Sequence, residues 1–260
     1  MPTIDENLNA WTNYNWSQSG DEWSDNWGGP EYMWALTIFP RIRSFLPTKQ
    51  ILEIAPGYGR ITQYLHKFCN KLIIVDLTEK CIIACRNRFK DVPNISYFIN
   101  DGKSLDMIPN NSIDFVFSWD SLVHAEKEVL ESYLKELSNK LTPDGVGFIH
   151  HSNLAIYKDA MTGLITVENK HWRGSSMSAV LFEKYCEEVG LQCICQEVIN
   201  WGDIILNDCF SVFTRKNSRF SRPNCFIENK SFVDEINHSL FISKIYNINP
   251  RPLEELSKEH

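Results

Sequence analysis

The stretch Ile51-Leu-Glu-Ile-Ala-Pro-Gly-Tyr-Gly-Arg60 decides the fold that this sequence predicts. Its first five residues are mostly apolar, as expected of a buried strand, and the glycines at 57 and 59 allow positive φ and close backbone approach. From Arg60 to Phe68 the apolar residues recur at helical spacing. A strand, a glycine turn and a helix N-terminus in this order predict a ligand-binding turn.

This turn differs from the dinucleotide-binding fingerprint G-x-G-x-x-G, because Thr62 stands at the third glycine position. An acidic residue also precedes the first glycine by four positions. The pattern Glu-x-Ala-x-Gly-x-Gly resembles motif I of the class I S-adenosylmethionine (SAM)-dependent methyltransferases, in which E/D-x-G-x-G-x-G is usual. The resemblance implies that SAM is bound by Glu53, Ala55, Gly57, Gly59 and Arg60, with S-adenosyl-L-homocysteine as the product.

Two further turns carry acidic residues in register with this pattern. A buried strand over residues 71–76 ends in Asp76, where βαβ nucleotide sites place an acid that accepts from the ribose hydroxyls. A third strand, residues 94–99, precedes a turn at which methyltransferases of this class often place an Asp that accepts from the adenine amino group. The resemblance therefore implies a cofactor site that also includes Leu77, Asp101, Gly102 and Trp119.

The remaining pattern indicates one α/β domain. Strands are expected at residues 51–55, 71–76, 94–99, 113–118, 145–151, 191–199 and 209–214, with amphipathic helices between several of them. The resemblance implies a Rossmann-like sheet of seven strands in the order 3-2-1-4-5-7-6, with helices on both faces. It covers residues 47–216, so residues 1–46 are expected to form an N-terminal cap and residues 217–260 a C-terminal extension.

The N-terminal 46 residues are unusually rich in tryptophan, at positions 11, 16, 23, 27 and 34. We expect a cap over the mouth of the main domain, in which Trp23, Trp27, Gly28 and Gly29 close over the cofactor or substrate and exclude water. Alternatively the tryptophans only bury the extension against the core, since each carries a large apolar area. Pro30 is suited to the first position of a following helix.

Histidines are concentrated at the ends of the fourth and fifth predicted strands. His124 follows residues 113–118, and His150 and His151 end residues 145–151. Histidine suits a general base near neutral pH, so we predict His124 as the base, with Asp120 orienting it. Because side chains alternate along a strand, only one of His150 and His151 can face the site. Asp120 with these histidines also leaves a divalent metal conceivable, although their spacing shows no recognised ligand motif.

The acceptor is expected to bind the poorly patterned segment of residues 152–177, which commonly holds the acceptor in this family. His171, Trp172 and Arg173 are its candidate residues, and Arg173 has planar donors suited to a carboxylate or phosphate. Residues 119–122 lack the Asn/Asp-Pro-Pro-Tyr of DNA-amino-methylating relatives, which argues against base methylation.

The composition limits which substrates and which cellular location are expected. The formal net charge of −7 supplies no basic face, so a nucleic acid is not expected as substrate. The eight cysteines include no C-x-x-C pair and indicate reduced thiols. The sequence shows no leader-like N-terminus and no run of 18 apolar residues, so we expect a cytoplasmic protein with no membrane span. Apolar residues between 226 and 246 predict packing on the domain or in a homo-oligomer.

The predicted activity is SAM-dependent O-methylation of a sugar or glycan hydroxyl. This finer assignment rests on the resemblance of the tryptophan-rich extension and of Gly147-Phe-Ile-His-His-Ser-Asn153 to bacterial sugar methyltransferases. Methylation of another small-molecule hydroxyl or amine is the alternative. An NAD-dependent oxidoreductase is disfavoured because no Tyr-x-x-x-Lys pair is present. A non-catalytic SAM-fold subunit is suggested only by Ala55.

Overall fold

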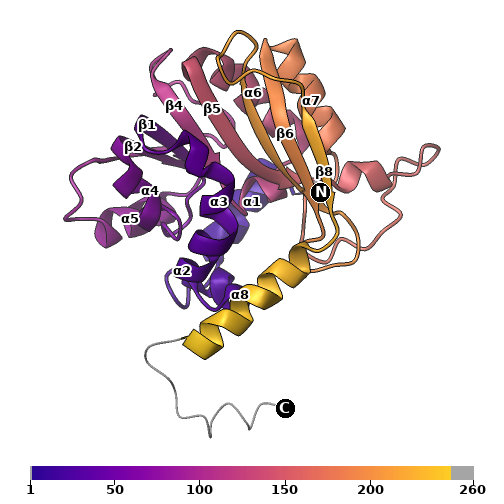
Figure 1. Cartoon of the computed structure of the whole chain (residues 1–260), viewed down its shortest axis with the longest axis horizontal. Helices are drawn as coiled ribbons and strands as arrows, with labels where there is room; N and C mark the ends of the chain where they lie inside the picture. Colours follow the sequence, from indigo (N-terminus) through magenta and orange to yellow (C-terminus); the bar gives the residue numbers. More distant parts are fainter. Residues whose placement is uncertain (1, 247–260) are drawn as a thin grey trace, which may run out of the picture.

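A computed structural model describes residues 2–246 as a single mixed sheet with helices on both faces (Figure 1). The strand order is β3-β2-β1-β4-β5-β7-β6-β8. The strands are β1 (Thr48–Ile54), β2 (Cys69–Asp76), β3 (Ile95–Ile99), β4 (Ile113–Ser118), β5 (Leu141–Ser152), β6 (Leu191–Ile199), β7 (Asp208–Arg215) and β8 (Cys225–Asn229).

The predicted order of the first seven strands is found, but the predicted strand count was wrong. Strands β1 to β5 run parallel, and β7 pairs antiparallel with both β5 and β6. The eighth strand, β8, pairs parallel with β6 at the edge of the sheet. Its residues are mostly exposed, so β8 lacks the apolar alternation by which a buried strand is recognised.

The helices begin where the sequence offers caps. Thr78 accepts from Cys81 N at the start of α5, and Ser178 accepts from Leu181 N at the start of α7. The α-helices are α1 (Ile4–Asn13), α2 (Pro30–Tyr32), α3 (Phe39–Ile42), α4 (Thr62–Leu65), α5 (Glu79–Arg88), α6 (Lys127–Lys140), α7 (Ala179–Glu188) and α8 (Phe232–Tyr246). None of the helices within residues 2–246 is both long and apolar enough to cross a membrane.

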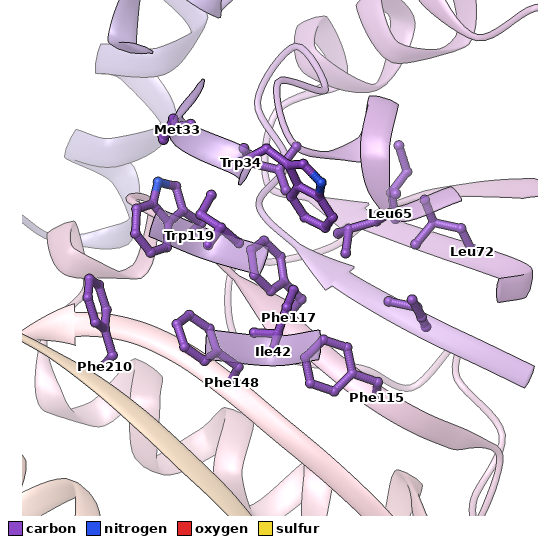
Figure 2. Packing of buried hydrophobic residues seen from close by; sticks show 14 of the residues in the cluster. Met33, Trp34, Ile42, Leu65, Leu72, Phe115, Phe117, Trp119, Phe148 and Phe210 are labelled. Atoms are coloured by element: carbon purple, nitrogen blue, oxygen red, sulfur yellow. The ribbon is translucent and has the colours of Figure 1, made fainter. Parts of the chain in front are cut away.

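Strand alternation divides the core into two apolar layers. One layer gathers side chains of β4, β5 and β7 beneath the chain from α2 to α4, including Phe115, Phe117, Phe148 and Phe210. Figure 2 shows these rings next to Trp119, Ile42 and Trp34. The other layer packs alternate residues of the same strands against α6 and α7. This division fixes which strand-end side chains can reach a site on the first face.

The N-terminal segment lies against the first face and the carboxyl ends of the strands. Thr3 and Glu6 form a reciprocal capping box at the start of α1, a helix that the tryptophan pattern did not reveal. Lys80 of α5 donates to the carbonyls of Thr12 and Tyr14 at 2.9 Å each. A 3₁₀ segment, η1 (Asp21–Trp27), follows, so the segment is fastened to the domain at several points.

The C-terminal helix α8 is held by few of its apolar residues. Phe232 is fully buried and Ile236 nearly so, whereas Phe241, Ile245 and Tyr246 are more than half exposed. These last three side chains do not pack on the domain, because α8 extends past its edge (Figure 1). Their packing in a homo-oligomer stays a prediction. Phe232 stacks on Trp201 at 5.7 Å and meets Phe210 at 5.5 Å.

Replacing Phe232 tests whether this anchor stabilises the fold. Phe232→Ala should lower the free energy of unfolding by about 3–5 kcal/mol, because it leaves a cavity beneath α8. Phe241→Ala, at a side chain that is 59% exposed on the same helix, should change it by less than about 1 kcal/mol. Urea unfolding followed by circular dichroism measures both, and equal effects would contradict the assignment of Phe232 as the anchor.

Candidate active site

A cavity of about 860 Å³ opens at the carboxyl ends of β1, β2 and β4. Its walls come from the turns after these strands, from α1 and η1, and from residues 170–173 and 201–202. Ligands of α/β sheets bind at this edge, and the volume is in the range of small-molecule and cofactor sites. The N-terminal segment forms part of the wall, through Trp11, Tyr14, Trp16 and Trp23 among others.

The turn after β1 depends on left-handed backbone at three positions. Ala55, Gly57 and Gly59 have φ of +57°, +58° and +83°. A Cβ on Gly59 would lie 2.5 Å from the ring of Phe89, so only glycine fits there. Ala55 takes a conformation that L side chains rarely adopt, which is the physical reason why glycine is usual at this place.

Two buried carboxyl groups lie at the floor of this turn. Asp76 accepts from the backbone and hydroxyl of Thr78 at 2.8 and 2.9 Å, and from Gly57 N at 3.2 Å. Burial raises the pKa of Asp76 to about 6. Glu53 accepts from the Thr62 hydroxyl at 2.6 Å, and burial, aided by the charge of Asp76, raises its pKa to about 8. Thr62, the residue that breaks the dinucleotide fingerprint, is thus the partner of Glu53.

The turn after β3 places only part of the predicted adenine site in the cavity. Leu77, directly after β2, and Gly102, after β3, line the cavity. Asp101 does not: its side chain is exposed, and its Oδ1 accepts from the backbone of Lys103 and Ser104 at 3.0 and 2.7 Å. These local hydrogen bonds engage one carboxylate oxygen, and Asp101 is not among the residues that line the cavity, so its contact with adenine stays a prediction.

After β4 the chain turns sharply at Asp120, whose φ is +53°. Its carboxylate lies 3.1 Å from Arg60 Nη2 and 3.6 Å from Arg173 Nη2, and it joins the glycine turn to the predicted acceptor segment. The neighbouring Trp119 is 4% exposed and lines the cavity. Its indole Nε1 has no partner among the described residues, so a donor is free for a ligand atom.

His124 lies in the wall of the cavity, against the rings of Trp11 and Trp172 at 5.2 and 5.5 Å. Its Nδ1 is 2.9 Å from the carbonyl oxygen of Trp172. A carbonyl only accepts, so Nδ1 carries the proton and Nε2 keeps a lone pair. Burial, with the charge of Arg173 acting in the same direction, lowers the pKa of His124 to about 4, and the ring is therefore neutral at pH 7.

The other two predicted histidines do not line the cavity. His150 lies behind Asp120, accepting from its backbone N–H at 3.1 Å and donating from Nε2 to Asp208 at 3.1 Å. His151 faces the opposite side of the sheet, where it stacks on Phe182 at 4.5 Å and bonds Ser211. Both histidines were predicted as catalytic candidates; full burial and these partners assign His150 to support and His151 to packing.

The predicted acceptor residues His171, Trp172 and Arg173 all line the cavity, and the buried Nε2 of His171 has no partner among the described residues. Trp27 also lines it, and donates to the Thr37 hydroxyl at 2.9 Å. Gly28 and Gly29 do not. A Cβ on Gly28 would lie 1.8 Å from Ser243 Oγ, so Gly28 serves the packing of α8 and does not close over a ligand.

Several residues that line the cavity were not identified from the sequence. They include Trp201, which contacts Trp27 and Trp119 at 5.3 and 5.8 Å, and Ile236 of α8. No local pattern marks them, because they come from a loop and a helix that only the folded chain brings to the cavity. Within residues 2–246 no group of three or more His, Cys, Asp or Glu side chains is arranged to hold a metal ion.

Comparisons with known proteins agree with this geometry. Residues 51–145 match a family model described as a methyltransferase domain. A ribosomal RNA small subunit methyltransferase A from Dehalococcoides mccartyi is 25% identical over 52% of this chain and 47% of its own length. Phosphoethanolamine N-methyltransferase 1 from Zea mays is 32% identical over 44% of this chain and 23% of its own length. The chain thus spans half or less of these curated relatives.

Solved structures show the same fold. A SAM-dependent methyltransferase from Leishmania major has a TM-score of 0.60 at 13% identity, covering 81% of this chain and 82% of that one. One from Aquifex aeolicus has a TM-score of 0.52 at 15% identity, covering 74% and 97%. The described chain thus has the fold of class I SAM-dependent methyltransferases, and its residues 51–145 match the model of a methyltransferase domain.

The residues of the cavity fit SAM. Asp76 stands at the end of β2 and lines the cavity, and its carboxylate accepts from Gly57 N of the glycine turn. The volume of the cavity suffices for a nucleoside with an amino-acid tail.

The raised pKa of Asp76 predicts a pH-dependent affinity for SAM. Only the ionised carboxylate accepts from both ribose hydroxyls, and the acid form predominates below about pH 6. The Kd for SAM should therefore rise about tenfold between about pH 7 and about pH 5. Calorimetry measures it. Asp76→Asn should bind more weakly and with no change over this interval, and a flat profile for the wild type would contradict the role of Asp76.

Proposed function

We propose that this protein transfers the methyl group of SAM to a hydroxyl of a small neutral acceptor, a sugar or glycan in first place, with His124 removing the proton. The observation that carries the proposal is the fixed tautomer of His124 on the cavity wall, with Nε2 lacking a partner among the described residues. Bound SAM supplies an already activated methyl group, so the protein has to position the acceptor and take its proton.

The charges at this end of the cavity support an uncharged acceptor. Arg60 and Arg173 are the arginines that line it, and they are paired with Asp120 and Asp208. Each charge is thus balanced inside the protein, which leaves no arginine free to bind a substrate phosphate. The sequence expectation that Arg173 binds such an anion is therefore replaced in this proposal by a structural role.

Aromatic faces and single polar groups complete the proposed acceptor site. Trp27, Trp119 and Trp201 offer apolar surfaces, while Trp119 Nε1 offers a donor that requires an oxygen acceptor on the ligand. A hydroxylated ring satisfies both, since its faces are apolar and its edge carries oxygens. This is why we favour a sugar over an aliphatic alcohol.

An amine is the second candidate acceptor, and a specific observation favours it. Glu22 Oε1 is buried without a partner among the described residues, and Glu22 lines the cavity beside several aromatic rings, including Tyr14 and Trp16. Carboxylates and aromatic faces both attract an ammonium group. Phosphoethanolamine appears in the name of one relative, although that relative is matched over 23% of its length only.

A screen for S-adenosylhomocysteine formation tests the acceptor class directly. The purified chain is given SAM with neutral sugars and nucleotide sugars in one set and with primary amines and phosphoethanolamine in the other. Turnover of the sugar set supports the proposal. Turnover confined to the amine set would instead support an amine as the acceptor. No turnover with any acceptor, in a protein that binds SAM, would contradict a small neutral acceptor of these kinds.

Replacing His124 tests the proposed base. His124→Gln should lower kcat by about a hundredfold to ten-thousandfold, because the proton of the hydroxyl loses its acceptor. The Kd for SAM should stay within about twofold of the wild type. His238→Gln, at an exposed histidine of α8, is the matched control and should leave kcat unchanged. An undiminished kcat in His124→Gln would rule out His124 as the base.

A further inference from the structure

The loop from Asn169 to Gly174 determines where His124 keeps its proton. The carbonyl that holds His124 Nδ1 belongs to Trp172, whose φ of +52° is unfavourable for a bulky side chain. Such a conformation persists only where its neighbours hold it. The tautomer of His124 therefore depends on whatever fixes this loop.

The backbone of the loop is tied to itself and to the turn that carries His124. Asn169 accepts from Arg173 N at 2.8 Å and donates to Arg173 O at 2.7 Å. Gly174 N donates to the carbonyl of Val123 at 2.7 Å, and Val123 is the residue before His124. These bonds hold the two ends of the loop, but none of them acts on the side chain of Arg173.

A buried ion pair holds that side chain. Arg173 Nε and Nη2 lie 3.1 and 2.8 Å from the two carboxylate oxygens of Asp208, the first residue of β7, and the two side chains are 4% and 0% exposed. A two-pronged pair fixes orientation as well as distance. His150 Nε2 donates to Asp208 at 3.1 Å, and His150 Nδ1 accepts from Asp120 N. These two bonds fix the imidazole ring, which in turn fixes the Asp208 carboxylate.

We infer that Asp208, supported by His150, is a positioning residue that holds Arg173 and thereby keeps the Trp172 carbonyl on His124 Nδ1. The inference rests on the proposed function, because the lone pair on Nε2 serves turnover only if His124 takes the acceptor's proton. The chain of contacts runs from β5 through β7 to the acceptor loop and ends at the cavity. This buried group of charges then has a task beyond packing, since it selects one of the two tautomers of His124.

The charged groups that bear on His124 are Arg173, Asp120 and Asp208. Helix α1 adds the uncharged Trp11 ring at 5.2 Å and the Asn7 amide, which donates to the His124 carbonyl at 3.0 Å. Release of the loop would admit water to the ring and move Arg173 away. Both changes favour the charged form. They remove the two largest influences on this pKa and outweigh the loss of the Trp172 hydrogen bond and of the Asp208 charge, so the pKa of His124 would rise from about 4 toward its ordinary value.

Nitrogen NMR of the histidine rings tests this geometry without any substrate. In the wild type, His124 should show the Nδ1–H tautomer alone and no titration between about pH 5 and about pH 8. In Asp208→Asn it should exchange between both tautomers and titrate with a midpoint inside this interval. His151, buried on the opposite face, should keep its wild-type pattern and so report in the same spectrum that the variant is folded.

Two more variants keep the test decisive. Arg173→Lys retains the positive charge but loses the two-pronged pair, so it should show the same two tautomers and the same titration of His124. It takes the place of Asp208→Asn if Asp208→Asn does not fold. Asp144→Asn removes a carboxylate paired with Arg219 at the surface, at 3.6 Å, and should leave His124 unchanged.

An unchanged tautomer and titration of His124 in folded Asp208→Asn or Arg173→Lys would overturn the inference. Failure of the proposed function looks different: the tautomer would shift as expected, while no acceptor in the screen would be methylated.

Discussion

Four buried charges at the carboxyl edge of the sheet have to neutralise one another. Asp120, Asp208, Arg60 and Arg173 come from four separate stretches of the chain, and their side chains are at most 10% exposed. Removal of one partner of such a group typically costs about 3–5 kcal/mol, because the remaining charge is left buried and unpaired. The glycine turn, the end of β4, the start of β7 and the acceptor loop are consequently held together at the place where the cavity opens.

The backbone around the cavity is also strained at three positions. Ala55, Asp120 and Trp172 all have positive φ, and all three line the cavity. Each such conformation costs of order 1–3 kcal/mol and requires support from its surroundings. The support comes from the hydrogen bond of Ser121 to Ala55 O at 2.7 Å, from His150 under Asp120, and from the ion pair beside Trp172. Strain of this kind gathers at sites that hold a ligand.

Local sequence was sufficient for the parts of the fold that obey local rules. Short apolar runs located the first seven strands, since each of these signals lies within a few residues. The glycines and Asp76 were identifiable because a turn and a strand end need these residue types. By contrast β8, at an edge with exposed side chains, carries no alternation, and α1 carries its signal in a capping box that the tryptophans obscured.

The site itself was only partly predictable, because its residues act through distant partners. Asp101 resembled a ligand residue by position, but it does not line the cavity, and the backbone N–H groups of Lys103 and Ser104 donate to its Oδ1. Strand alternation predicted that only one of His150 and His151 could face the site, but it could not show that neither of them lines the cavity. Arg173 appeared to be a substrate contact until Asp208, 35 residues later in the chain, was found to pair with it. Long-range pairing of charges leaves no local pattern.

Calorimetric titration of SAM into the wild type and into Gly57→Val tests the central claim most directly, namely that this cavity is a SAM site. A valine at Gly57 would place a branched side chain at a φ of +58°, with its Cβ about 3.1 Å from the ring of Trp16. We predict a micromolar Kd for the wild type, about −8 kcal/mol, and no measurable binding by the folded variant. Absence of binding by the wild type, or equal binding by both proteins, would contradict the account.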